Sequence, residues 1–212
     1  MTGATVTAGR RGRVTLGFEL QGALAASRNL GLLADRLPWV QRRAVQTLRR
    51  RLPVQARRDI QAEYNLTAQR INQDLVTRAD DRGVRLIGRF RGIGLRNFAA
   101  RRTAKGVTAS ILRGRRSLRK GAFFAPLLGG NTHVVERYGE KRVMTQGRYK
   151  GKRRQPIAVE YGATVAQMLA KGRRPERLAD FARGVLGNEI ERLFAYYDRP
   201  GGFPTTTSEE SP

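Results

Sequence analysis

The chain has 212 residues and a formal net charge of +25, because 42 lysines and arginines stand against 17 acidic residues. This length fits one domain with short arms and is too small for two sizeable cores. The absence of cysteine excludes disulfide scaffolds, thiolate zinc sites and cysteine nucleophiles, and the single histidine, His133, excludes sites that need two imidazoles. No run of about 18 apolar residues is present, so we expect no membrane-spanning segment and no membrane partner.

The charge surplus indicates an anionic partner, because so many positive charges on a small chain repel one another unless they are neutralised. Nucleic acid is the first candidate and an acidic protein in a large assembly is the second. A membrane surface is the weakest candidate, because the basic residues do not gather in one cluster. The surplus is 20 over residues 1–135, 5 over residues 136–170 and 0 over residues 171–212. The positive field therefore lies before residue 171.

The N-terminal region combines an arm with a short strand. Residues 1–13 are rich in threonine, glycine and arginine, so we expect an N-terminal arm that is flexible or is ordered by a partner. In residues 14–20, apolar and polar residues alternate with the period of two that predicts a strand with one apolar face. Residues 21–35 give no clear pattern, because Gly22 and Gly31 interrupt their apolar residues.

A long basic helix is predicted over residues 38–64. Its apolar residues begin at Trp39 and recur at spacings of three and four, and Pro38 suits a first helical turn. Pro53 lies inside the pattern, so we expect it to kink the helix or to split it in two. The opposite face carries Arg42, Arg43, Arg49, Arg50, Arg57 and Arg58. This face is either a solvated surface or a contact for phosphate or an acidic partner, and the scarcity of nearby acids favours the contact.

Short strands separated by turns are predicted after this helix. Thr67 is a suitable N-cap for a short helix that ends near Asp74. Segments rich in β-branched or aromatic residues follow, and each turn between them supplies a residue that tolerates a positive φ. The segments are residues 75–80, 84–90, 97–101, 107–113, 122–127 and 132–138. We expect an antiparallel sheet or a partly closed barrel of hairpins.

A basic loop is predicted over residues 139–155, where glycines interrupt a run of cations. The candidate contact residues in it are Arg148, Lys150, Lys152, Arg153 and Arg154. One more strand is predicted over residues 156–161. The loop is the second part of the chain, after the long helix, that we expect to meet an anionic partner.

Two helices close the predicted domain. Thr164 is placed to cap a short helix over residues 165–170. Pro175 opens a second helix over residues 176–197, with an apolar stripe that begins at Leu178. The chain is thus expected to be α+β, with N-terminal basic helices, antiparallel hairpins and a C-terminal amphipathic helix. Its predicted divisions are a flexible arm over residues 1–13, a single domain over residues 14–198 and a C-terminal tail over residues 199–212.

The sequence lacks the motifs that catalysis and specific base recognition require. Residues 92–97 lack the third glycine of a dinucleotide-binding fingerprint, and no phosphate-binding loop of the GxxxxGK[ST] type is present. A lone histidine at a strand start, such as His133, is typical of a hydrogen-bonded structural residue. We therefore expect no enzyme, no cofactor, no metal site and no small-molecule substrate. The aromatic residues do not interleave with the basic ones, so a contact with nucleic acid is expected to be electrostatic.

Three stretches of the chain resemble the minor tail protein Z family of long-tailed bacteriophages, the tail-completion proteins. The first is the arginine-rich helix over residues 40–60 followed by NLTAQRI at residues 65–71. The second is FAARRTAKGVT at residues 98–108 followed by GAFFA at residues 121–125, which is similar to an F-x-A-R-x-T-x-x-G-V hairpin and its A-F-I/F-A strand. The third is QPIAVEYGATVAQML at residues 155–169, which is similar to an L-P-I-x-x-x-Y-G-P-S-V signature.

The third stretch is the most specific of these matches, because it fixes order and spacing over about 15 residues. It departs from the signature at Gln155, where the family has leucine, and at Ala163, where the family tends to have proline. The matches together span residues 40–197 and leave both ends of the chain uncovered.

The resemblance implies a structural virion protein with an α+β build and no catalytic residues. Such proteins complete the head-proximal end of the tail, support head–tail joining and DNA positioning, and act as rings that are commonly hexamers. The implied partners are the tail terminator, tail tube or head–tail connector proteins and the viral DNA in the channel, met by electrostatics. The implied location is the virion tail or neck, after assembly in the host cytoplasm. The alternative from composition alone is a sequence-nonspecific nucleic-acid-binding protein, such as a ribosome-associated or DNA-packaging factor.

Overall fold

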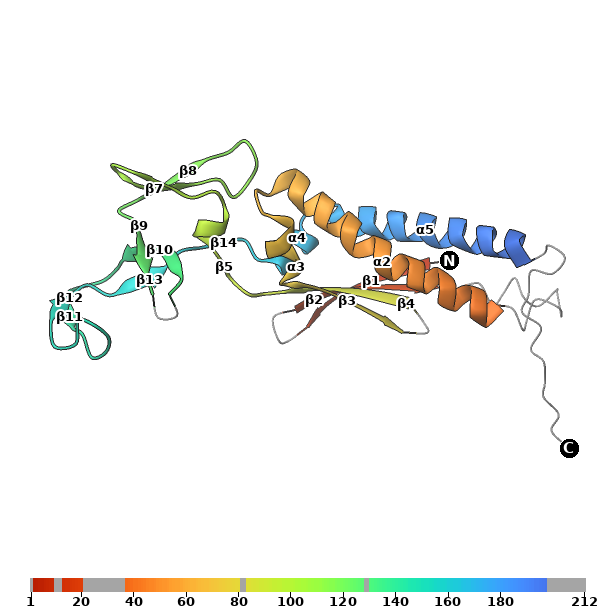
Figure 1. The fold of residues 1–212 in the computed structure, drawn as a ribbon, viewed down its shortest axis with the longest axis horizontal. Coiled ribbons are helices and arrows are strands. Elements are labelled where there is room, and N and C mark those ends of the chain that lie inside the picture. The colour runs from red at the N-terminus through yellow and green to blue at the C-terminus, as the bar shows by residue number, and fades with distance from the viewer. Residues whose placement is uncertain (1, 10–12, 21–36, 81–82, 128–129, 198–212) are drawn as a thin grey trace, which may run out of the picture.

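The fold combines a layer of helices on a sheet with an extension of small antiparallel sheets (Figure 1). The computed structural model describes residues 2–9, 13–20, 37–80, 83–127 and 130–197. The predicted α+β class is confirmed by these helices and antiparallel sheets. The predictions for residues 21–35 and for the tail at 199–212 fall outside the described residues.

The helices lie close to their predicted positions. They are α2 (Leu37–Glu63), α3 (Ala68–Asn72), α4 (Val165–Ala170) and α5 (Arg174–Tyr197). The Thr67 side chain accepts a hydrogen bond from the Arg70 amide, and Thr164 and Gln167 form a reciprocal capping box at α4. Both predicted N-caps are therefore confirmed.

Helix α2 continues through Pro53 as one helix of 27 residues. The expectation that proline splits this helix is therefore wrong. Leu52 and Ala56, on either side of Pro53, are fully buried in the core. Their packing compensates the hydrogen bond that proline cannot donate.

Four antiparallel strands make the main sheet in the order β1-β2-β4-β3. They are β1 (Thr2–Gly9), β2 (Arg13–Leu20), β3 (Leu75–Asp80) and β4 (Gly83–Arg89). Strands β2, β3 and β4 match predicted strands. Strand β1 corrects the prediction of a flexible arm over residues 1–13, because Thr2–Gly9 pairs along its whole length with β2. Its three threonines and Val6 are β-branched residues that suit a strand once a partner supplies the hydrogen bonds.

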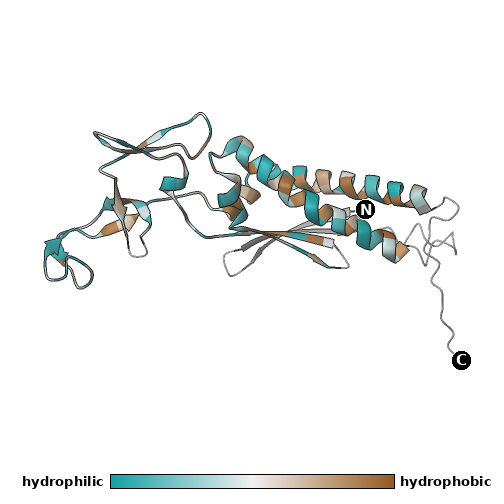
Figure 2. Cartoon of the chain, viewed as in Figure 1, coloured by the Kyte–Doolittle hydropathy of each residue, from teal (hydrophilic) through white to brown (hydrophobic). Residues whose placement is uncertain are grey.

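The core lies between this sheet and the helices, which cover one of its faces (Figure 1). Helix α2 packs on β3 and β4, α5 packs on α2 and on β1 and β2, and α4 packs on β2 and β4. Figure 2 shows the apolar residues along the helix sides that face this interior. In β4 the buried Val84 and Leu86 alternate with the exposed Arg85 and Arg89, so the other face of the sheet presents arginine.

A separate set of short strands extends from one end of this layer (Figure 1). Strand β5 (Ile93–Gly94) pairs with β14 (Tyr161–Gly162) at the base of the extension. Beyond it lie a three-stranded sheet of β6 (Arg101–Thr103), β7 (Gly106–Ala109) and β8 (Ser117–Lys120) and another of β9 (Phe123–Pro126), β10 (Thr132–Arg137) and β13 (Ile157–Val159). The sheets of the described residues stay separate, so the predicted barrel does not close.

The extension also corrects several predicted boundaries. Of residues 97–101 only Arg101 lies in a strand, because the 3₁₀ turn η2 (Leu95–Asn97) and a further turn precede β6. Strand β7 ends at Ala109, so the predicted strand over residues 107–113 is too long. Strand β8 is absent from the predictions, because its four residues are all exposed and carry no apolar alternation.

Candidate nucleic-acid and partner interface

The predicted arginines of α2 line the outer side of the helix, away from the core. Five of them are exposed and Arg57 is half-buried, with its Nη1 atom donating to Asn72 Oδ1 at 3.4 Å. The exposed ones are Arg42, Arg43, Arg49, Arg50 and Arg58. The Arg43 guanidinium lies 5.5 Å from the centroid of the Trp39 ring. Trp39 is 39% exposed, which corrects its prediction as the first residue of the buried stripe.

The predicted basic loop is a hairpin closed by two short strands, β11 (Arg142–Val143) and β12 (Arg153–Arg154). This pairing corrects the prediction that residues 139–155 form only a loop. It sets Arg142 opposite Arg154, two like charges that an anion between them would stabilise. Four of the five predicted contact residues are exposed, and Arg154 is half-buried.

An aromatic ring organises the cations of this hairpin. The Arg154 guanidinium lies 3.8 Å from the centroid of the Tyr149 ring, and the Arg148 guanidinium lies 5.9 Å from it. Arg154 lowers the pKa of the Tyr149 hydroxyl by a hydrogen bond and by its charge. The ring therefore holds the half-buried Arg154 in place, whereas Lys150, Lys152 and Arg153 are exposed.

A cavity of about 610 Å³ lies between the hairpin and strands β9 and β13. Its apolar lining includes Phe123, Met144 and Ile157, and Arg137 stands over the Phe123 ring at 5.2 Å. Neither the apolar lining nor its closeness to the hairpin is evident from the sequence, because the contributing segments are up to 34 residues apart. The predicted loop is thus the outer wall of an apolar cavity with a cationic rim.

The structure does not bring the two predicted basic groups together. Helix α2 begins at one end of the molecule, and β11 and β12 lie at the opposite end (Figure 1). Figure 2 shows hydrophilic residues both on the outer side of α2 and in the hairpin. The two predicted basic groups therefore form two separate surfaces, one on α2 and one on the hairpin.

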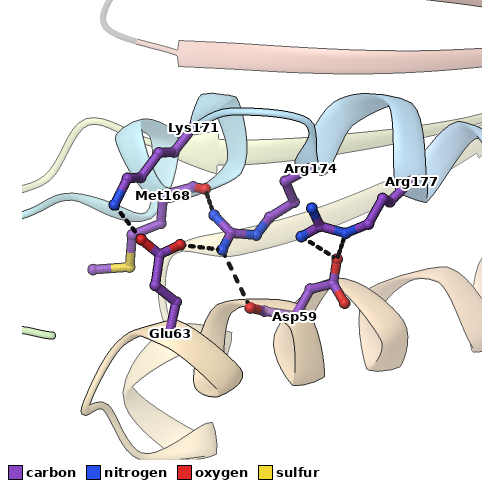
Figure 3. Close-up of polar contacts among 6 residues, drawn as sticks. All are labelled: Asp59, Glu63, Met168, Lys171, Arg174 and Arg177. Atoms are coloured by element: carbon purple, nitrogen blue, oxygen red, sulfur yellow. Dashed lines mark hydrogen bonds and ion pairs between the residues drawn. The ribbon is translucent and has the colours of Figure 1, made fainter. Parts of the chain in front are cut away.

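A third charged group, which the sequence does not predict, joins α2, α4 and α5 (Figure 3). Arg174 is only 2% exposed, and its Nη2 atom donates to Glu63 Oε2 at 2.8 Å and to the Asp59 carbonyl at 3.2 Å. Its Nη1 atom donates to the Met168 carbonyl, and Lys171 donates to the other carboxylate oxygen of Glu63. The Lys171 hydrogen bond lowers the pKa of Glu63, with help from Arg174, and Glu63 raises the pKa of Lys171. These contacts fasten the C-terminal helices to α2, so their role is structural.

Other kinds of site find little support in the part of the chain that the structure describes. No three histidine, cysteine, aspartate or glutamate side chains gather there as metal ligands would. Its helices include none with the length and apolar character needed to cross a bilayer.

Comparison with protein-family models, with curated proteins and with solved structures finds no match to this chain. The resemblance to the minor tail protein Z family therefore rests on the three stretches quoted above.

Proposed function

We propose that this chain is a structural virion protein of a long-tailed bacteriophage that completes the head-proximal end of the tail. In this role it supports head–tail joining and DNA positioning as a ring of identical subunits, in contact with the tail terminator, the tail tube or the head–tail connector. The observation that carries the proposal is the ordered match of residues 155–169 to the family signature. This segment forms β13, β14 and the capped helix α4, the junction between the extension and the helical layer.

Contacts between the matched stretches support the proposal. Gly162, in the third stretch, lies directly against Phe98, in the second. A Cβ atom at Gly162 would lie 2.3 Å from Phe98 Cε2, so the second and third stretches require each other's residues. If the chain has the family's fold, segments that match the family separately are expected to contact each other in the structure.

The charge distribution also suits an assembly around DNA. Six copies would carry about 150 formal positive charges, which the DNA in the channel or acidic neighbours must neutralise. The two cationic surfaces at opposite ends of the molecule give each subunit two places for such contacts.

The alternative function is sequence-nonspecific nucleic-acid binding, as in a ribosome-associated or DNA-packaging factor. The net charge of +25 favours it, and it requires neither a virion nor a ring. The genes beside this one distinguish the two: portal, tail-tube and tape-measure genes as neighbours favour the virion protein.

Mass spectrometry of purified virions and of tailless heads tests the proposal. We expect the chain in complete virions, in a stoichiometry that matches a ring, and absent from tailless heads. Absence from virions would contradict the proposed function and leave the nucleic-acid-binding alternative.

A further inference from the structure

A groove of about 770 Å³ lies where the extension meets the helical layer, apart from both predicted basic surfaces. Four separate segments line it: the end of α3, the turn around β5 and η2, the start of β10, and β14. The lining residues are Arg70, Gln73, Arg91, Gly92, Gly94, Arg96, Asn97, Asn131, Thr132, His133 and Tyr161. The groove is therefore a product of tertiary structure that no single sequence motif marks.

The lining residues are suited to an anion. Three arginines and one histidine contribute to the groove, and none of its described lining residues carries a carboxylate. Arg70 is the most neutralised of the cations, because its Nη1 atom lies 2.6 Å from the buried Asp74 carboxylate. The positive potential of the groove thus comes mainly from Arg91 and Arg96, which are both exposed.

Hydrogen bonds within the groove hold its walls in place. Arg96 donates from Nη1 to the Thr132 carbonyl at 3.1 Å, which fixes the guanidinium and leaves its other donors available. Asn97 donates from Nδ2 to the Gly94 carbonyl at 3.0 Å. A guanidinium anchored in this way loses little entropy when it binds an oxyanion with its remaining donors.

The lining favours a phosphodiester backbone over an acidic peptide. Grooves that hold peptides provide apolar pockets for anchor side chains. The lining residues here are polar or charged apart from two glycines and one large ring, Tyr161, which is 55% exposed beside Gly92. An exposed ring among arginines is the arrangement that stacks an unpaired base while cations hold the phosphates.

We propose that this groove binds the phosphodiester backbone of nucleic acid, with Arg91 and Arg96 as its phosphate contacts and Tyr161 as a stacking surface. The inference rests on the proposed function in that it names where a DNA-positioning subunit holds its DNA. Binding of nucleic acid to the purified protein tests this inference without the need for virions. A chain present in virions whose groove binds no nucleic acid would overturn this inference alone. Binding by a chain absent from virions would overturn the proposed function alone.

The binding experiment compares two double variants of the full-length chain with the same loss of charge. Arg91→Gln with Arg96→Gln removes two groove cations, and Arg113→Gln with Arg115→Gln removes two exposed cations from the turn after β7. Fluorescence anisotropy measures affinity for a single-stranded oligonucleotide, for a duplex of equal length and for polyglutamate over a series of salt concentrations. We expect the groove pair to weaken nucleic-acid binding about tenfold and to lower the slope of log affinity against log salt by about two. Equal effects of the two pairs, or tighter binding of polyglutamate than of either nucleic acid, would overturn the proposal.

Substitutions at Gly94 test the groove without removing a residue that contacts the ligand. A Cβ atom there would lie 3.7 Å from His133 Nδ1 and 3.9 Å from Asn97 Nδ2, which is ordinary contact, and Gly94 caps η2. Aspartate and asparagine are both favoured at such a cap, so neither variant should harm folding. We expect Gly94→Asp to weaken binding of both nucleic acids at least tenfold and Gly94→Asn, of the same shape, to weaken it less than threefold. Equal affinities of the two variants would show that charge in the groove is irrelevant and would overturn the proposal.

The Tyr161→Leu variant identifies the form of the nucleic acid. A stacking role predicts a loss of affinity of about fivefold or more for the single strand and little change for the duplex. Equal affinity of the variant and the parent chain for both forms would overturn the role of Tyr161 as a stacking surface.

Discussion

At the scale of single residues, the burial of Arg174 sets the strength of the contact between α2 and α5. A guanidinium that is 2% exposed is costly to desolvate, and its hydrogen bonds to Glu63 and to two carbonyl groups offset that cost. The neighbouring pair of Arg177 and Asp59 has similar chemistry, with a 3.1 Å distance, but Arg177 is 56% exposed. The two arginines therefore form a natural comparison of a buried with a solvated ion pair.

We expect Arg174→Met to lower the free energy of unfolding by about 2–3 kcal/mol, because buried carbonyl groups lose their donor. Arg177→Met should change it by less than about 1 kcal/mol, because water screens that pair. Urea denaturation of both variants measures the difference. Equal losses of unfolding free energy in the two variants would mean that the Arg174 cluster stabilises the fold no more than a surface ion pair does.

Acid should weaken the same contact through Glu63. The folded state lowers the pKa of Glu63 below its ordinary value of 4.5, so the carboxylate adds stability above that pH, and this stability is lost as the pH falls through the lowered pKa. Arg192 and Thr47 lower the pKa of Glu189 and add to the same dependence. Glu63→Gln should reduce stability near neutral pH and flatten its loss in acid, as measured by urea denaturation at about pH 7 and about pH 3. If the stability of the variant depended on pH as that of the parent chain does, Glu63 would be excluded as a cause of the loss of stability in acid.

The sequence predicts residues whose roles depend on near neighbours and not those that depend on distant ones. The caps at Thr67 and Thr164 are predictable because each bonds an amide three residues away. Arg174 is not, because a charged residue beside Pro175 suggests a surface, and its partner Glu63 lies 111 residues earlier. The groove around His133 escapes prediction for the same reason.

At the scale of elements, a glycine fixes how closely α4 approaches the sheet. A Cβ atom at Gly88 in β4 would lie 2.8 Å from Leu169 Cδ1 and 3.0 Å from the backbone of Ala166. Any larger side chain must therefore push α4 away from β4. Gly184, in α5, is exposed and has open space in the direction of a Cβ atom.

We expect Gly88→Ala to destabilise the protein by about 1–3 kcal/mol, because the added methyl group overpacks the contact between α4 and β4. Gly184→Ala should instead stabilise it by about 0.5–1 kcal/mol, because alanine has the better helix propensity. Thermal and urea denaturation of both variants measure these opposite signs. A neutral Gly88→Ala would mean that α4 shifts freely on the sheet.

Elements with their own periodic pattern are predictable, and elements defined by their partners are less so. The predicted limits of α4 and β3 coincide with the observed ones, because caps, turns and alternation lie within each segment. Strands β8, β11 and β12 have no apolar face and exist through pairing with a neighbour. The separation of the hairpins into small sheets also follows from packing between segments, which local patterns do not encode.

At the scale of the whole molecule, the fold is elongated, and it places the start of α2 and the hairpin of β11 and β12 at opposite ends (Figure 1). The elongated arrangement of helical layer and extension is not evident from a sequence that predicts one domain over residues 14–198. With the groove between them, the proposed tail-completion subunit would meet DNA near its middle and other proteins at its ends. Such a division of roles predicts that loss of one end impairs one contact and leaves the rest of assembly intact.

The hairpin provides the test of this division. We expect replacement of its five candidate cations by glutamine to reduce head–tail joining at least tenfold, because a rim that attracts an acidic partner is lost, while tail length stays unchanged. The replaced residues are Arg148, Lys150, Lys152, Arg153 and Arg154. The matched control replaces five exposed cations of the β6–β7–β8 region, and we expect it to join heads normally. The control residues are Arg101, Arg102, Lys105, Arg113 and Arg115.

Electron microscopy of lysates complemented with each variant counts joined particles, free heads and free tails. Free heads beside tails of normal length in the hairpin variant, with normal virions in the control, would support a docking role for the hairpin. Normal joining by the hairpin variant would make the hairpin a solvated surface. Equal failure of both variants would assign the effect to total charge, since the two remove the same number of cations from different surfaces.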